Sequence, residues 1–140
     1  INERFYKLKK IITFGTFDVF HVGHVNILER AKAMGDYLIV GVSSDQLNMS
    51  KKGRNPIYSE DDRMHIIKAL SCVDEALFEH SLELKGKYIK QYEADVLVMG
   101  NDWEGRFDEF KSICEVKYFP RTPSISTTEI IEVVKSTPNK

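Results

Sequence analysis

The chain has 140 residues, enough for one globular domain with a sizeable core. Its 42% hydrophobic and 29% charged content is that of an ordinary soluble protein, and a net charge of −1 argues against general nucleic-acid binding. Cys72 and Cys114 lack metal or redox spacing and are expected to be small buried side chains. No apolar run approaches a membrane span and no signal peptide is evident, so a cytoplasmic location without membrane contact is expected.

Short apolar runs alternate with helical patterns along the chain, which predicts a parallel sheet with crossover helices. Strands are predicted at 11–14, 37–42, 73–78, 95–99 and 115–119. Helices are predicted at 24–34, from a Ser59 cap to about residue 70, and at 82–92, 106–112 and 127–134, the last capped by Ser126. The polar, basic segment 48–56 carries Gly and Pro and is expected to be a mobile loop.

These elements predict an α/β fold, a Rossmann-like doubly wound sheet of five parallel strands in a single domain spanning 1–140. Residues 1–9 and 136–140 are expected to be flexible ends. In such folds ligands bind beyond the carboxyl ends of the strands, near the switch in strand order.

The segment 15–24, GTFDVFHVGH, joins the first predicted strand to the first predicted helix. Backbone N–H groups at a helix N-terminus and the helix dipole favour bound anions. His21 and His24 are three residues apart and can lie on one side of that first turn, with Gly23 leaving room for a ligand. The two histidines could also be metal ligands, but no Cys or third His follows at a spacing that completes a zinc site. The segment therefore favours polyphosphate binding.

Together with MGNDWEG at 99–105 and RTPSISTT at 121–128, this segment resembles the nucleotidyltransferase superfamily marked by a His-x-Gly-His signature. The similarity runs over nearly the whole chain. It is greatest to the small bacterial cytidylyltransferases, especially those that act on glycerol 3-phosphate. All three segments follow predicted strands, which places them on one edge of the sheet independently of the resemblance.

The resemblance implies transfer of CMP from CTP to a small phosphorylated alcohol, with glycerol 3-phosphate the best single candidate, giving CDP-glycerol and pyrophosphate. An acceptor phosphate is already ionised near neutral pH, so catalysis reduces mostly to positioning and charge neutralisation. The expected catalytic residues are His21, His24, Lys51, Arg63 and Arg121. The expected nucleotide-binding residues are Gly15, Thr16, Phe17, Asp18, Gly100, Asp102, Trp103, Arg121, Ser126, Thr127 and Thr128. The expected acceptor-binding residues are Lys51 and Lys85.

Several of these side chains keep two interpretations. Asp18 either caps its turn or helps to organise the site or a metal. Trp103 either belongs to the core or lines the nucleotide pocket, and Asp102 can accept hydrogen bonds from a base or ribose. Arg121 offers a forked donor for phosphate, while Ser126 caps a helix whose N-terminus is a second anion site. No dedicated protein metal ligands are expected, because Mg²⁺ usually binds through the triphosphate.

The chain departs from the family pattern in three places. The second expected loop lysine falls near Gly53, with Lys52 or Arg54 as substitutes. Leu82 stands where glycerol-phosphate members carry Trp, and the pair at 123–124 is Pro-Ser in place of Glu-Gly. These departures keep open a different phospho-acceptor or nucleoside triphosphate.

An alternative interpretation, in a different functional class, is a nucleotide-binding regulatory module that has lost catalysis. The presence of both histidines disfavours this alternative. A Rossmann oxidoreductase is disfavoured because the first turn lacks Gly-x-Gly-x-x-Gly. The resemblance also implies a homodimer and a role in making a cell-surface polysaccharide.

Overall fold

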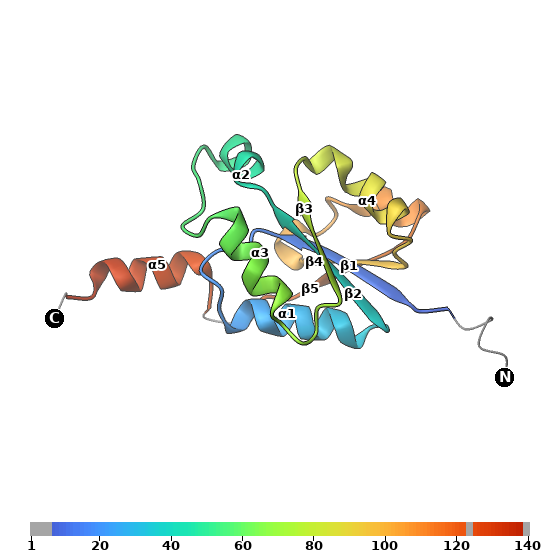
Figure 1. Cartoon of the computed structure of the whole chain (residues 1–140), viewed down its shortest axis with the longest axis horizontal. Helices are drawn as coiled ribbons and strands as arrows, with labels where there is room; N and C mark the ends of the chain where they lie inside the picture. The colour runs from blue at the N-terminus through green and yellow to red at the C-terminus, as the bar shows by residue number, and fades with distance from the viewer. Residues whose placement is uncertain (1–6, 123–124, 139–140) are drawn as a thin grey trace.

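A computed structural model describes residues 7–122 and 125–138. Its five strands form one parallel sheet in the order β3-β2-β1-β4-β5 (Figure 1). The strands are β1 (Lys10–Gly15), β2 (Tyr37–Ser43), β3 (Glu75–Glu79), β4 (Val96–Gly100) and β5 (Glu115–Phe119). The strand order reverses between β1 and β4, the position at which open parallel sheets bind ligands. The predicted doubly wound five-stranded class is confirmed.

Helices cover both faces of the sheet. The α-helices are α1 (Val22–Ala33), α2 (Asp45–Lys52), α3 (Glu60–Lys68), α4 (Lys85–Gln91) and α5 (Thr127–Ser136). Short 3₁₀ helices are η2 (Leu82–Leu84), η3 (Asn101–Trp103) and η4 (Asp108–Ser112). Figure 1 shows α1 and α3 on one side of the sheet and α4 on the other. No helix in the described part of the chain is long and apolar enough to cross a membrane.

Side chains that alternate along β1 divide the core into two clusters. Ile11 joins Leu28 of α1 and Ile67 of α3 in the first cluster. Ile12 joins Ile89 of α4 in the second. Because successive side chains of a strand point to opposite faces, the central strand is apolar on both sides, as a sheet covered by two layers requires.

The segment after β2 is a helix where a loop was predicted, so the prediction of a loop over 48–56 is wrong for 48–52. Ser44 caps α2 by accepting a hydrogen bond from the Leu47 N–H at 3.1 Å. Gly53 ends the helix in the left-handed region, with φ of 71°. Asn48 is buried, and its Nδ2 donates to the Ser44 carbonyl at 2.9 Å. A polar side chain that points inward therefore looked like part of a solvated loop.

Most other predicted boundaries agree with the structure to within two residues. The Ser59 and Ser126 caps are confirmed, since each hydroxyl accepts a backbone N–H three residues later. Two predicted helices are shorter: 82–92 begins with the 3₁₀ turn η2, and 106–112 is the 3₁₀ helix η4.

The two chain ends, 1–9 and 136–140, were expected to be flexible. Residues 1–6 and 139–140 lie outside the described part. Lys9 is tied down, because its N–H donates to Asp36 Oδ2 at 2.8 Å. At the other end, Ser136 is the last residue of α5.

The helix α5 differs from the others because none of its residues is buried. It projects away from the sheet in Figure 1. Val133 and Val134 are 62% and 68% exposed, although both are apolar. The first turn of α5 nevertheless reaches back to the carboxyl edge of the sheet, where the candidate site lies.

Candidate active site

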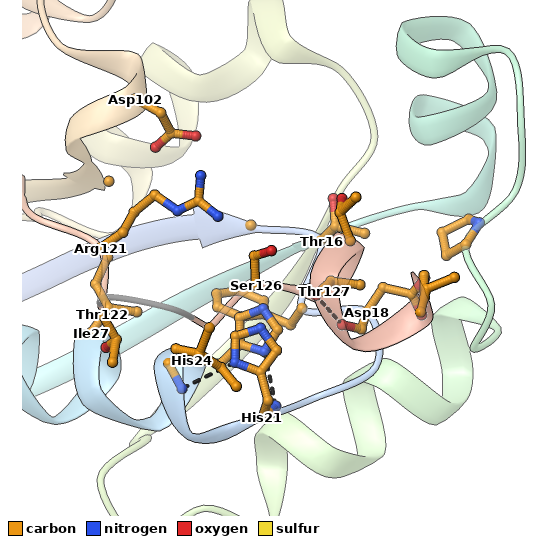
Figure 2. A pocket seen from close by; sticks show the side chains of 18 of the residues that line it. Thr16, Asp18, His21, His24, Ile27, Asp102, Arg121, Thr122, Ser126 and Thr127 are labelled. Atoms are coloured by element: carbon orange, nitrogen blue, oxygen red, sulfur yellow. Dashed lines mark hydrogen bonds between the residues drawn. The ribbon is translucent and has the colours of Figure 1, made fainter. Parts of the chain in front are cut away.

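A cleft of about 520 Å³ opens at the carboxyl edge of the sheet, within the range of small-molecule sites. The turn after β1, the residues after β4 and the segment that leads into α5 surround it (Figure 2). Its lining contains every predicted nucleotide-binding residue, namely Gly15, Thr16, Phe17, Asp18, Gly100, Asp102, Trp103, Arg121, Ser126, Thr127 and Thr128, together with His21 and His24. The prediction that the three sequence segments meet on one edge is confirmed.

The two histidines form the N-terminal cap of α1. His21 is the N-cap residue, and its Nδ1 accepts the Gly23 N–H at 3.0 Å. His24 Nδ1 in turn accepts the His21 N–H at 3.1 Å, and the two rings stack with centroids 3.8 Å apart. Because each Nδ1 is an acceptor, each neutral ring carries its hydrogen on Nε2. Both imidazoles therefore offer an Nε2–H donor whose orientation is set before a ligand arrives.

The electrostatics keep both rings neutral at neutral pH. Burial, followed by the charge of neighbouring His21, lowers the pKa of His24 to about 4, although Asp18 acts in the opposite direction. Burial also lowers the pKa of His21, and the charge of Arg121 lowers it further. A neutral imidazole that presents an Nε2–H group is suited to donating a hydrogen bond to a phosphate oxygen. It is less suited to abstracting a proton.

Gly23 lines the cleft and also makes room for the His21 side chain. A Cβ at this position would lie 2.8 Å from Cε1 of the His21 ring, closer than real Cβ contacts. The glycine therefore lets His21 fold back over the first turn of α1 and cap it.

The turn between β1 and α1 is strained, and Asp18 holds it in place. Phe17 and Val19 have φ of 55° and 45°, in a region that β-branched residues in particular avoid. The Asp18 carboxylate accepts backbone N–H groups of Val19 at 3.0 Å, Ile57 at 2.7 Å and Tyr58 at 2.8 Å. The structure shows Asp18 bracing the turn against the segment before α3, and Asp18 also lines the cleft.

The segment that leads into α5 carries a second set of anion-binding groups. Arg121 is exposed, and its guanidinium makes no hydrogen bond or ion pair to another residue in the part of the chain described. Figure 2 shows it extending across the cleft from the side of Thr122, with Asp102 beyond it. The Ser126 hydroxyl accepts the Glu129 N–H at 3.1 Å, so the first N–H groups of α5 remain for a ligand.

Arg63 does not reach the cleft, contrary to the expected phosphate contact. It is fully buried, and its Nε donates to the Tyr58 carbonyl at 3.0 Å. Its Nη1 donates to the carbonyls of Thr16 at 2.9 Å and Ser43 at 2.7 Å, and its Nη2 to Asp45 Oδ1 at 2.7 Å. The guanidinium thus ties together the ends of β1 and β2 beneath the cleft.

The two lysines expected at the acceptor also lie off the cleft lining. Lys85 is 1% exposed, forms an ion pair with Glu79, and places Nζ 4.0 Å from the centre of the Phe14 ring. Burial lowers the pKa of Lys51, while the nearby Glu79 charge raises it. Of the two lysines, Lys85 is thus the one that the structure pairs with Glu79. Lys52 and Arg54, the candidate substitutes for the second loop lysine, do line the cleft.

Trp103 combines its two interpretations. Its ring lies 5.5 Å from the Phe107 ring, which belongs to the periphery of the second core cluster, and it also lines the cleft. In the described residues, no three His, Cys, Asp or Glu side chains gather as a metal site would require.

Several lining residues escaped the sequence analysis. Asn48 supports the cleft floor, because its Oδ1 accepts the Thr16 hydroxyl at 3.0 Å. The available signal was Ser44, a residue type that favours the N-cap position of a helix. Asn26 and Thr122 also line the cleft and bond to each other. No local pattern marks that pair, since the two residues are 96 positions apart.

Comparisons with known proteins agree with this geometry. A cytidylyltransferase-like family model matches residues 12–133. The glycerol-3-phosphate cytidylyltransferase of Bacillus subtilis (strain 168) is 47% identical over 127 residues, which are 91% of this chain and 98% of that protein. The Staphylococcus aureus (strain NCTC 8325 / PS 47) protein of the same name is 42% identical over 88% of this chain and 92% of its own.

Among solved structures, the lipopolysaccharide core biosynthesis protein from Thermoplasma volcanium GSS1 superimposes with a TM-score of 0.70 at 26% identity. That match covers 83% of this chain and 98% of the other. The family model, the relatives and the shared fold lead to one conclusion: the chain belongs to the cytidylyltransferase-like family.

Proposed function

We propose that this protein is an enzyme that transfers CMP from CTP to glycerol 3-phosphate, with release of pyrophosphate and formation of CDP-glycerol. The observation that carries the proposal is the cleft in which two neutral imidazoles, Arg121 and the N-terminus of α5 face one space. The names of the Bacillus and Staphylococcus relatives, which the chain matches over nearly their full length, supply the substrates.

The reaction needs no strong base from the protein. An oxygen of the acceptor phosphate attacks the α-phosphorus of CTP, and the bond from that phosphorus to the bridging oxygen breaks. The electron pair leaves with pyrophosphate. The Nε2–H groups of His21 and His24 donate to phosphate oxygens as negative charge develops there. Arg121 and the first N–H groups of α5 neutralise the departing phosphates.

We also propose that Mg²⁺ reaches the cleft on the triphosphate. The Asp18 carboxylate accepts three backbone N–H groups and supports the turn. Asp102 is an exposed carboxylate on the cleft and would hold the ion through its water shell. An ion held there would neutralise part of the triphosphate charge.

A second candidate keeps the reaction and changes the phosphorylated acceptor. The observation that favours it is the state of the residues expected at the acceptor: Lys85 lies off the cleft lining and is paired with Glu79, and Leu82 is 39% exposed. For glycerol 3-phosphate to use Lys85, its dianionic phosphate must replace Glu79 as the partner of the ammonium group. An acceptor that does not need Lys85 would avoid that exchange.

The wider setting follows from the same proposal. The exposed apolar Val133 and Val134 support a homodimer, because a second copy would cover such side chains. A cytoplasmic enzyme that makes CDP-glycerol would supply an activated precursor for a cell-surface polysaccharide.

The test is pyrophosphate release with Mg²⁺ over a grid of the four common NTPs and several phospho-alcohols. Turnover that requires CTP and glycerol 3-phosphate supports the proposal. Turnover with CTP and another phospho-alcohol selects the second candidate. CTP binding without pyrophosphate release from any acceptor would point instead to a regulatory module.

A further inference from the structure

The segment that brings Arg121 to the cleft has few attachments to the rest of the molecule. No residue of α5 is buried, so packing of that helix does not fix its position. Two side-chain hydrogen bonds join the segment to the body of the described protein. Thr127 Oγ1 donates to the Asp18 carbonyl at 2.8 Å, and Asn26 Nδ2 donates to Thr122 Oγ1 at 3.0 Å. Ile125 adds an apolar contact over Gly23.

Asn26 connects this segment to the helix of the histidines. It lies two residues after His24 in α1, is half-buried and lines the cleft. Its partner Thr122 directly follows Arg121 in the chain. The Asn26 amide therefore relates the position of the guanidinium to that of the imidazoles through one hydrogen bond.

We infer that Asn26 is a positioning residue for the nucleotide: by holding Thr122, it keeps Arg121 directed at the phosphates that the histidines bind. The inference rests on the proposed function for the identity of the nucleotide. Its geometric part, the hydrogen bond from Asn26 to Thr122 and the shared cleft that Arg121 and His21 line, does not depend on turnover.

Electrostatics supplies a readout of that placement in the free protein. After burial, the Arg121 charge is the next cause that lowers the pKa of His21. An Arg121 that moves away must therefore let this pKa rise. NMR titration of His21 in Arg121→Ala gives the value that corresponds to complete loss of the guanidinium.

The experiment combines Asn26→Ala, Thr122→Val and the double variant in a double-mutant cycle. In both single variants the His21 pKa should rise toward the Arg121→Ala value. The Kd for CTP with Mg²⁺ should rise about two- to tenfold, the range expected from one lost intramolecular hydrogen bond. The KM of the acceptor should stay unchanged, and the double variant should be no worse than either single one.

Two matched controls accompany the cycle. Thr122→Ser retains the hydroxyl and should restore both the His21 pKa and the CTP affinity. Thr137→Val removes the same hydroxyl chemistry from the far end of α5, where Oγ1 donates to the Val133 carbonyl, and should change neither.

A His21 pKa that stays at the wild-type value in Asn26→Ala would overturn the inference, as would additive effects in the double variant. Failure of the proposed function has a different signature. If another nucleotide replaces CTP in the activity grid, the His21 titration still reports on Asn26, because it is recorded without nucleotide.

Discussion

Arg121 and Arg63 carry the same guanidinium group in opposite surroundings. Arg121 lines the cleft, and Arg63 lies beneath it. Arg121 is exposed and bonds to no other residue in the described ranges, whereas Arg63 is fully buried and donates four hydrogen bonds to oxygen atoms of the protein. A cation without protein partners is available to a ligand, and a cation whose donors are used holds the fold together. The same contrast separates the two imidazoles at the N-terminus of α1 from Lys85. The imidazoles present Nε2–H donors to a ligand, whereas the Lys85 ammonium group is already paired with Glu79.

The largest expected effect concerns the histidines, which present Nε2–H donors to a ligand. His24→Ala removes a preoriented Nε2–H and should lower kcat about a hundred- to a thousandfold, equivalent to about 2.7–4 kcal/mol. Pyrophosphate release measures the loss, with His65→Ala on the exposed side of α3 as the matched control. An unchanged rate in His24→Ala would remove this histidine from the chemistry.

Because the donors of Arg63 bond to oxygen atoms of the protein, Arg63→Ala should chiefly destabilise the fold. Three carbonyl oxygens, that of buried Ser43 among them, lose their donor, so the free energy of unfolding should fall by about 3 kcal/mol. Arg63→Lys should not restore it, because an ammonium group cannot reproduce the guanidinium fork. Urea denaturation measures both.

The control for that experiment is Arg121→Ala, which should change stability by less than about 0.5 kcal/mol while it weakens CTP binding. If Arg63→Ala kept full stability and lost only activity, the contrast between the two arginines would be wrong.

Acid should weaken the fold through His24. Its pKa in the folded protein is about 4, against an ordinary 6.5, so the unfolded chain binds the proton more readily between these values. The stabilisation is fully present above pH 6.5 and is lost as the pH falls toward 4, with a total of at most about 3 kcal/mol. Urea denaturation from pH 7.5 to 4.5 should show this slope in the wild type and a flatter one in His24→Gln. Equal slopes would contradict the neutral, buried imidazole.

The smallest expected effect on the reaction itself concerns the KM of the acceptor. Lys85→Met leaves Glu79 buried without its partner and should cost about 3–5 kcal/mol of stability, whereas Lys85→Met with Glu79→Gln should fold nearly as the wild type does. In that double variant the acceptor KM should rise about tenfold, the loss of one hydrogen bond to a charged group, at constant CTP KM. A normal acceptor KM would assign the Lys85–Glu79 pair to the fold alone.

The strands and the nucleotide side were predictable because their signals are local. An apolar run followed by Gly15 or Gly100 marks the end of a strand, and Ser59 and Ser126 mark helix starts. Such signals place residues at an edge of the sheet. They also placed both histidines on one turn, which the stacked rings confirm.

The inward bonding of Arg63 was not predictable, because it depends on partners far away in the chain. Arg63 bonds to the Thr16 carbonyl, 47 residues away, and to the Ser43 carbonyl, 20 residues away. A sequence shows that a cationic side chain is present. It does not show that backbone oxygens already accept the hydrogen bonds of that side chain. The same holds for Asn48, whose amide bonds inward to the end of β2.

The exposed helix α5 has a consequence for how the protein opens locally. It has ten residues, shorter than isolated helices that are stable in water, and it buries none of them. Its backbone amides should therefore exchange hydrogen with solvent through small local unfolding events, well before those of the sheet. A nucleotide that binds only when the first turn of α5 is formed adds its binding free energy to that turn. Under the proposed function, α5 would thus gain order from the nucleotide that its first turn binds.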